Sequence, residues 1–211
     1  MKPLVVINFK TYMESSGRNS LELAKKLESV SADAKIILAV QAADLYKLNT
    51  ITIPLFVQHI DPFEYGAKTG SVIPDAVKEY GAKGTLINHS EKRISFSLIK
   101  ETIEICKTKN LETIVCVENG DEAARVSLFQ PDYIAIEPKE LIGGNISVSE
   151  AKPELISDTI KKISVPLLCG AGIHTNEDFK KALDLGAVGI LISSSVVKSN
   201  DPEKKLKEIL G

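Results

Sequence analysis

Short runs of apolar residues, rich in β-branched side chains, recur along the 211 residues of the chain. Nearly every position within each run is apolar, a pattern typical of strands that are buried on both faces. The runs predict eight strands, over residues 4–9, 35–40, 54–60, 84–88, 112–117, 132–136, 166–169 and 188–192. Strands of this kind belong to parallel sheets whose faces are covered by other elements.

Segments with the apolar spacing of amphipathic helices lie between the predicted strands. They predict helices that include residues 21–30, 96–107, 151–163, 178–185 and 203–210. Thr175 to Asp178 has the pattern of a capping box, and Pro202 falls just inside the start of the last helix. The lysines of that last helix should lie on its solvated face. Gly81 and Gly186 stand where helices end, each just before the next strand.

Eight strand–helix units favour a closed α/β fold, the (β/α)8 or TIM barrel. Because about 250 residues is typical of this barrel, the chain would be a compact version. The alternative is an open doubly wound sheet, which would carry a glycine-rich turn after an early strand. Residues 4–12 contain no glycine. No linker or low-complexity stretch interrupts the pattern, so we predict one domain over residues 1–211.

Composition and charge exclude several classes of protein. The chain is 44% hydrophobic and 26% charged, and its net charge of −2 offers no basic surface for nucleic acid or for an anionic membrane. No run approaches the ~18–20 apolar residues of a membrane span. The first predicted strand begins at Leu4, before a secretion signal could fit, so we expect a cytoplasmic protein. Cys106, Cys116 and Cys169 are odd in number and far apart, and we expect them to be reduced and buried.

Polar residues follow five of the predicted strands at the carboxyl ends, where barrels of this kind place their active sites. They are Asn8 and Lys10 after the first strand, His89 and Glu91 after the fourth, Glu137 after the sixth, Gly172 after the seventh, and Ser193 and Ser194 after the eighth. Each has an ordinary explanation when taken alone: a solvated lysine, a structural histidine, an ion pair between Glu137 and Lys139, or a simple turn. Their convergence on one face of a barrel would indicate a site.

The residue types fit removal of a proton next to a carbonyl group. Glu137 could supply the base, and general-base help is typically worth ~10²–10⁴ in rate. The segment after it contains glycine and could close as a lid. The carbonyl oxygen becomes an enediolate, which needs fixed donors, and His89, Lys10 and Asn8 could provide them.

Glycine and serine residues at the ends of the last two strands suit a phosphate group. Gly172, Ser193 and Ser194 can present backbone N–H groups to an anion, which a short helix starting there would assist. The sequence contains no metal-binding pattern, because its three histidines lie in separate segments. The reaction itself requires no metal and no redox cofactor, so we expect neither.

Four motifs together resemble the triosephosphate isomerase family in its shorter, archaeal form, over essentially the whole chain. They are Asn8-Phe-Lys10, His89-Ser-Glu-Lys-Arg93, Ile136-Glu-Pro-Lys-Glu-Leu-Ile-Gly143 and Cys169-Gly-Ala-Gly172. The resemblance implies that the substrates are dihydroxyacetone phosphate and D-glyceraldehyde 3-phosphate. The family interconverts them through an enediol(ate) in glycolysis and gluconeogenesis, inside a barrel whose sixth loop closes over the phosphate.

The same resemblance assigns roles to individual residues. Glu137 matches the family's base and His89 its neutral imidazole electrophile, an assignment taken from the family. Lys10 matches the cation that attracts the substrate. Glu91 matches a carboxylate that pairs with Lys10, although a pair with Arg93 is the alternative. The family's remaining substrate and phosphate contacts correspond to Asn8, Ile142, Gly172, Ser193 and Ser194.

The segment from Gly66 to Gly70 resembles the family's third loop, which projects into a neighbouring subunit. The resemblance therefore implies a homodimer or a homotetramer, and a surface turn is the alternative.

Two positions depart from the family pattern. The sequence reads Gly143-Gly144-Asn145 where archaeal relatives usually have Gly-Thr-Gly, and Ser195 stands where a glycine commonly follows the serine pair. If that glycine had a positive φ, Ser195 would be strained.

Two other functions use the same residues. A Schiff-base aldolase would use Lys10 as its nucleophile. A non-catalytic sugar-phosphate binding protein would keep the phosphate contacts and would need no carboxylate facing the substrate carbon.

Overall fold

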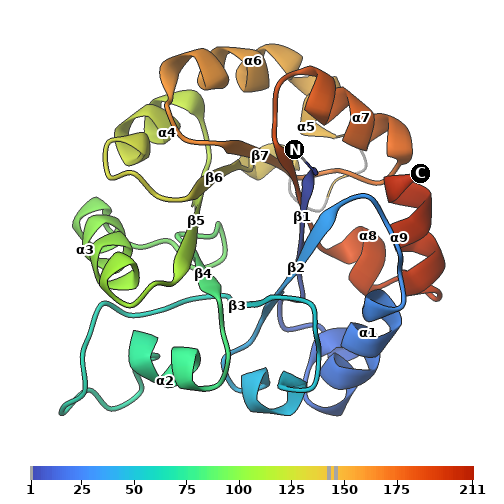
Figure 1. Ribbon diagram of the computed structural model, residues 1–211. Helices are drawn as coiled ribbons and strands as arrows, with labels where there is room; N and C mark the ends of the chain where they lie inside the picture. The colour runs from blue at the N-terminus through green and yellow to red at the C-terminus, as the bar shows by residue number, and fades with distance from the viewer. Residues whose placement is uncertain (1, 142–143, 145–146) are drawn as a thin grey trace.

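Eight parallel strands close into a barrel in the order of the chain, with helices around the outside (Figure 1). The computed structural model describes residues 2–141, 144 and 147–211. The strands are β1 (Leu4–Asn8), β2 (Lys35–Val40), β3 (Leu55–Val57), β4 (Gly84–Ile87), β5 (Glu112–Val117), β6 (Tyr133–Ile136), β7 (Leu167–Gly170) and β8 (Gly189–Ile192). The last strand pairs with the first, Leu4 opposite Gly189, so the sheet has no open edge. The predicted (β/α)8 barrel is confirmed.

The outer layer consists of short helices. The α-helices are α1 (Arg18–Glu28), α2 (Pro74–Glu79), α3 (Phe96–Thr108), α4 (Gly120–Ser127), α5 (Val148–Ala151), α6 (Pro153–Lys162), α7 (Asn176–Asp184), α8 (Ser194–Val197) and α9 (Pro202–Leu210). Three 3₁₀ helices accompany them: η1 (Met13–Ser15), η2 (Leu45–Leu48) and η3 (Lys139–Leu141). In the part of the chain that the structure describes, no helix is long and apolar enough to cross a membrane.

Local sequence explains where several helices begin and end. The capping box predicted at Thr175 is present, with Thr175 Oγ1 accepting from the N–H of Asp178. The helix predicted over residues 151–163 is α6, which begins two residues later than predicted. Lys152 leaves the helical conformation and separates α6 from α5, which ends at Ala151. The link between β2 and β3 contains η2 in place of an α-helix, which shortens this unit of the barrel.

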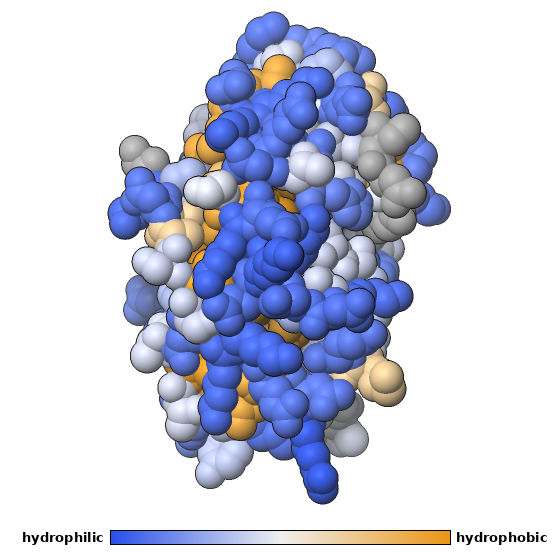
Figure 2. Space-filling view, turned by 90° about the vertical axis from the view of Figure 1, so that its right-hand side faces the viewer, coloured by the Kyte–Doolittle hydropathy of each residue, from blue (hydrophilic) through white to orange (hydrophobic). Residues whose placement is uncertain are grey.

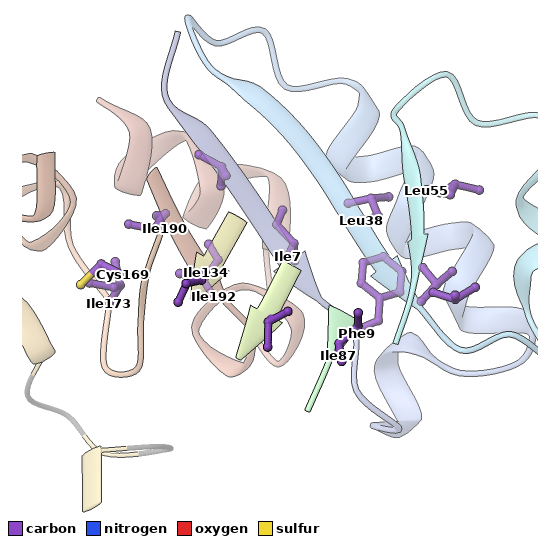
Figure 3. Packing of buried hydrophobic residues seen from close by; sticks show 14 of the residues in the cluster. Ile7, Phe9, Leu38, Leu55, Ile87, Ile134, Cys169, Ile173, Ile190 and Ile192 are labelled. Atoms are coloured by element: carbon purple, nitrogen blue, oxygen red, sulfur yellow. The ribbon is translucent and has the colours of Figure 1, made fainter. Parts of the chain in front are cut away.

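Alternation along the strands divides the core into two parts. One part fills the barrel: Leu4, Val6, Ile37, Ala39, Phe56, Leu86, Ile114, Cys116, Ala135, Leu168 and Leu191. The other part lies between the strands and the helices, where residues such as Ile7, Phe9 and Leu38 pack (Figure 3). Val6 and Ala135 point inward, so the residues two positions further, Asn8 and Glu137, continue the inward row at the carboxyl end.

The outer surface is mostly polar. Figure 2 shows the side of the molecule formed by α1, α7 and α9, where hydrophilic side chains predominate and hydrophobic ones lie in the gaps between them. In α9, Leu206 and Ile209 are buried and Lys207 Nζ donates to Glu203 at 2.6 Å on the exposed side. The lysines of the last helix therefore lie on its solvated face, as predicted.

Candidate active site

The carboxyl ends of the strands bring most of the predicted site residues together in one cavity. Lys10, His89, Glu137, Gly172, Ser193 and Ser194 all line it. Asn8 and Glu91 line an adjoining cavity, which shares Lys10 and His89 with the first one. Ile142 lies outside the described residues. One end of the barrel thus holds the cation, the imidazole, the carboxylate and both segments proposed to bind phosphate.

His89 and Glu137 face each other at the bottom of this cavity. Both residues are 6% exposed, and 3.5 Å separates His89 Nε2 from Glu137 Oε2. Among the described residues neither atom has a hydrogen-bond partner. Buried polar atoms without partners are uncommon and costly, on the order of 1–3 kcal/mol each. Two of them, aimed at one space, indicate a site for a polar ligand.

The other ring nitrogen of His89 determines which tautomer this geometry requires. His89 Nδ1 accepts from the backbone N–H of Glu91 at 3.2 Å, so this nitrogen is unprotonated. In the neutral ring the proton then resides on Nε2, which becomes a donor directed into the cavity. The arrangement supplies an imidazole Nε2–H donor beside a carboxylate.

The strand fixes the backbone of Glu137, and a glycine on the neighbouring strand leaves room for its side chain. Its backbone N–H donates to Val117 O at 2.8 Å, which fixes the end of β6 against β5. A Cβ added to Gly170, in β7, would lie 2.4 Å from Glu137 Cγ. Gly170 therefore leaves the space that the carboxylate side chain occupies.

The three cysteines are free and buried, as predicted. Burial, followed by the negative charge of Glu137, raises the pKa of the Cys116 thiol well above its usual value. Burial also raises the pKa of Cys106 to about 12, with a smaller effect of Asp132. These thiols therefore stay protonated and act as small apolar residues.

Lys10 reaches the cavity from a strained turn after β1. Its φ of 49° is left-handed, a conformation that residues with a side chain seldom adopt. Asn8 Oδ1 accepts from the Lys10 N–H at 2.9 Å, and Gln58 Nε2 donates to Lys10 O at 2.9 Å. Gln58 Nε2 also approaches Asn8 Oδ1 at 3.2 Å. Side-chain hydrogen bonds thus hold the turn in its unfavourable conformation.

Glu91 pairs with Lys10. Lys10 Nζ donates to Glu91 Oε1 at 2.8 Å, and the lysine side chain is 13% exposed. Arg93 instead forms an ion pair with Glu122. Of the two partners considered for Glu91 in the sequence, the structure has Lys10. No contact joins Glu137 to Lys139 among the described ion pairs, so the ordinary explanation of Glu137 fails.

The serine segment after β8 opens toward the same cavity. Ser193 precedes α8, and its Oγ is buried without a partner among the described residues. In α8 the N–H groups of Val196 and Val197 donate to Ser193 O, and among the described residues no acceptor is seen for those of Ser194 and Ser195, which can bind an anion. Ser195 lies inside α8 and has no positive φ, so the serine that replaces the family's glycine is not strained.

His174 also lines the cavity, and it contacts the segment after η3. His174 Nε2 lies 2.9 Å from Gly144 O, a distance at which the ring donates to the carbonyl. Gly144 N–H donates to Leu141 O at 3.1 Å. Gly143 and Asn145, the other two residues of the departure at 143–145, lie outside the described residues.

Comparison with known proteins identifies the family. The family model for triosephosphate isomerase matches residues 3–210. The chain belongs to the triosephosphate isomerase family. Among its relatives are proteins named triosephosphate isomerase from Methanocaldococcus jannaschii, 46% identical, and Methanothermus fervidus, 45% identical. The alignments cover 98% and 99% of this chain, respectively, and 98% of each relative. A third, from Methanobrevibacter smithii, is 44% identical over 99% of this chain and 98% of its own length.

Sequence reasoning missed three residues of this triosephosphate isomerase site. Gln58 lay inside a predicted strand, yet β3 ends at Val57, and a polar side chain at that point was the available signal. His174 lies in a loop that sequence patterns do not place. Gly170 belonged to a motif quoted for the family, but only the coordinates reveal its contact with Glu137.

Substitution of Gly170 should damage catalysis by displacing the carboxylate. Gly170→Ala places a methyl group 2.4 Å from Glu137 Cγ, so Glu137 must move. Because misplacement of a catalytic group by ~1 Å can cost ~10² in rate, we expect kcat to fall by about that factor. The rate of triose phosphate interconversion measures kcat, and circular dichroism measures whether the variant is folded.

A matched control is Gly120→Ala, whose added Cβ would lie 2.9 Å from Thr159 Oγ1, away from the cavity. That variant should keep its kcat. A folded Gly170→Ala protein with unchanged kcat would contradict the role given to Gly170.

Proposed function

We propose that the protein is a triosephosphate isomerase, which interconverts dihydroxyacetone phosphate and D-glyceraldehyde 3-phosphate by proton transfer. The observation that carries the proposal is the pair of buried, unpartnered atoms, His89 Nε2 and Glu137 Oε2, in one cavity. Membership of the family supports it. The reaction is a step of glycolysis and gluconeogenesis. We therefore expect the protein in the cytoplasm, where its sugar phosphates occur.

Glu137 acts as the base. Its carboxylate takes a proton from the carbon next to the carbonyl group, and the electron pair of the C–H bond moves to form an enediolate. The hydroxyl proton on the neighbouring carbon passes to the enediolate oxygen, so that a carbonyl group can form at that neighbouring carbon. The protonated carboxyl group returns its proton to the carbon that bore the first carbonyl group, which completes the isomerisation. The buried position suits this role, because exclusion of water strengthens electrostatic interactions and protects the intermediate.

His89, Lys10 and Asn8 stabilise the oxygen on which negative charge develops. His89 supplies the Nε2–H donor, since its Nδ1 is already occupied by the N–H of Glu91. Lys10 brings a positive charge that Glu91 holds in place. Asn8 Oδ1 is used by Lys10 and Gln58, which leaves the Asn8 Nδ2 group as a donor. Each fixed donor of this type is worth on the order of 10²–10³ in rate.

Gly172, Ser193 and Ser194 bind the phosphate group. They lie on the side of the cavity formed by the ends of β7 and β8, where loops of (β/α)8 barrels commonly bind phosphate. The start of α8 offers backbone N–H groups, and the unpartnered Ser193 Oγ offers a hydroxyl. The substrate contact of Ile142 stays a prediction from the family. The hydrogen bond between His174 and Gly144 places Gly144 at the cavity.

The proposed steps require no metal and no redox cofactor. Of the two other functions considered, the Schiff-base aldolase finds no support, because its nucleophile must be a free amine and Lys10 Nζ is bound to Glu91. A binding protein without catalysis gives no reason to bury a carboxylate beside an imidazole donor.

Removal of the carboxylate charge at Glu137 should abolish most turnover. Glu137→Gln keeps the shape of the side chain but cannot accept the proton, so we expect kcat to fall by about 10²–10⁴. Binding of inorganic phosphate should persist. A coupled assay measures turnover, and incorporation of solvent deuterium into the triose phosphate measures proton transfer itself.

Glu112→Gln provides the control, because it removes the same charge at the start of β5, away from the carboxyl ends of the strands where the cavity lies. Near wild-type deuterium incorporation by Glu137→Gln would remove Glu137 from the role of base.

We further propose that the protein forms a homodimer or a homotetramer through the loop from Gly66 to Gly70. The stem of this loop is closed, since the Asp61 N–H donates to Val72 O and the Val72 N–H to Asp61 Oδ2, each at 2.8 Å. Its tip is exposed and projects from the barrel (Figure 1). Exposed apolar side chains, Tyr65 at 70% and Met13 at 78%, lie directly before this loop and on η1. A second copy would cover them.

A charge at the base of this loop should separate the subunits. Tyr65→Asp is expected to reduce the mass measured by sedimentation equilibrium to that of one chain and to lower kcat, because the neighbouring site loses its partner loop. Tyr46→Asp is the control, since Tyr46 is 67% exposed but lies on η2. A wild-type protein that sediments as one chain at assay concentrations would contradict the proposal.

A further inference from the structure

The loop that carries His89 and Glu91 is held by a carboxylate outside the cavity. Asn88 begins this loop and Arg93 lies near its end, and both contact Glu122 in the first turn of α4. Asn88 Nδ2 donates to Glu122 Oε1 at 3.2 Å, and Arg93 Nη2 forms an ion pair with the same oxygen. Glu122 Oε2 accepts from the Glu118 N–H at 2.8 Å. One carboxylate oxygen contacts both ends of this loop, and the other accepts from the segment between β5 and α4.

Asn88 depends on these contacts because its backbone is strained. It is 2% exposed and has a φ of 62°, in the left-handed region. Its Nδ2 also donates to Cys116 O at 3.0 Å, and its Oδ1 accepts from the Ile94 N–H at 3.1 Å. The amide thus ties β5, α4 and the far end of the loop together. Since Asn88 directly precedes His89, its conformation sets the direction in which the imidazole points.

Glu122 contacts the loop residues Asn88 and Arg93 with one oxygen, and its other oxygen accepts from the Glu118 N–H just before α4. It is not among the residues that line the cavity with His89 and Glu137. The cap of α4 is supplied by Asn119, whose Oδ1 accepts from the Glu122 N–H at 2.9 Å. That side chain is nevertheless only 17% exposed. A largely buried carboxylate with three donors is an arrangement that fixes positions strongly.

We propose that Glu122 is a positioning residue for the isomerase. Through Asn88 and Arg93 it fixes both ends of the loop, and so it holds His89 Nε2 opposite Glu137 and Glu91 against Lys10. This inference rests on the proposed function. Glu122 touches neither the substrate nor the reacting atoms, and its effect reaches them only through the loop.

The test is Glu122→Gln, which preserves the size of the side chain, removes its charge and replaces one acceptor by a donor. We expect kcat to fall about ten-fold while KM changes by less than about two-fold, because the donor is misplaced chiefly for the transition state. The affinity for an enediolate analogue should fall by the same factor as kcat. Inhibition by inorganic phosphate should not change, since the proposed phosphate site lies at β7 and β8. Loss of stability alone would not produce this division.

Asp121→Asn is the matched control. It removes the same charge from the same turn of α4, but the Asp121 side chain is 92% exposed and its ion pair is with Lys162. This variant should retain kcat, KM and the affinity for the analogue.

The outcomes separate the two proposals. A wild-type protein without isomerase activity would defeat the proposed function itself. An active wild type together with a folded Glu122→Gln protein whose kcat and affinity for the analogue are unchanged would overturn the role of Glu122, as would a change confined to KM. If Glu122→Gln does not fold, Arg93→Met is measured in the same way, because it releases the end of the loop and leaves Glu122 in place. Wild-type kcat in Arg93→Met would then overturn the inference.

Discussion

The site depends on the constraint that a closed barrel imposes on side-chain direction. Alternation sends every second residue of a strand inward, so Glu137 continues the row of Ala135, and Asn8 that of Val6. The layer below is apolar, which keeps water from reaching the carboxylate from that side. Glu137 Oε2 and His89 Nε2 remain unpartnered at a cost that the fold must offset elsewhere. In the proposed function, the substrate is the partner of both atoms.

Strain around the site is distributed over loops that side chains hold rigidly. Lys10 and Asn88 both have left-handed backbones. Lys10 forms hydrogen bonds with Asn8 and Gln58, and Asn88 forms one with Glu122. Conformations of this kind persist only where neighbouring groups determine them. As a result, Lys10 and His89 both extend from turns whose conformation is fixed by hydrogen bonds. The chain after η3 approaches the cavity by its contact with His174.

Much of the fold could be predicted from the sequence, and so could the gathering of most candidate site residues at one end of the barrel, because both follow from local patterns. Buried parallel strands leave continuous apolar runs, and a polar residue at the end of a run is visible at once, as with Glu137. The contacts that could not be predicted are those between segments far apart in the chain. The hydrogen bonds of Gln58 and the approach of His174 to Gly144 join segments far apart in the chain, and no local pattern encodes them. The short η2 in place of a helix was also not predicted.

The most direct test of the central claim is a crystal structure of the complex with an enediolate analogue. The analogue should contact both Glu137 and His89, with a carboxylate oxygen against the reacting carbon and Nε2–H donating to the oxygen. Its phosphate should lie at Gly172, Ser193 and Ser194. An analogue bound elsewhere, or with either side chain turned away from it, would contradict the account.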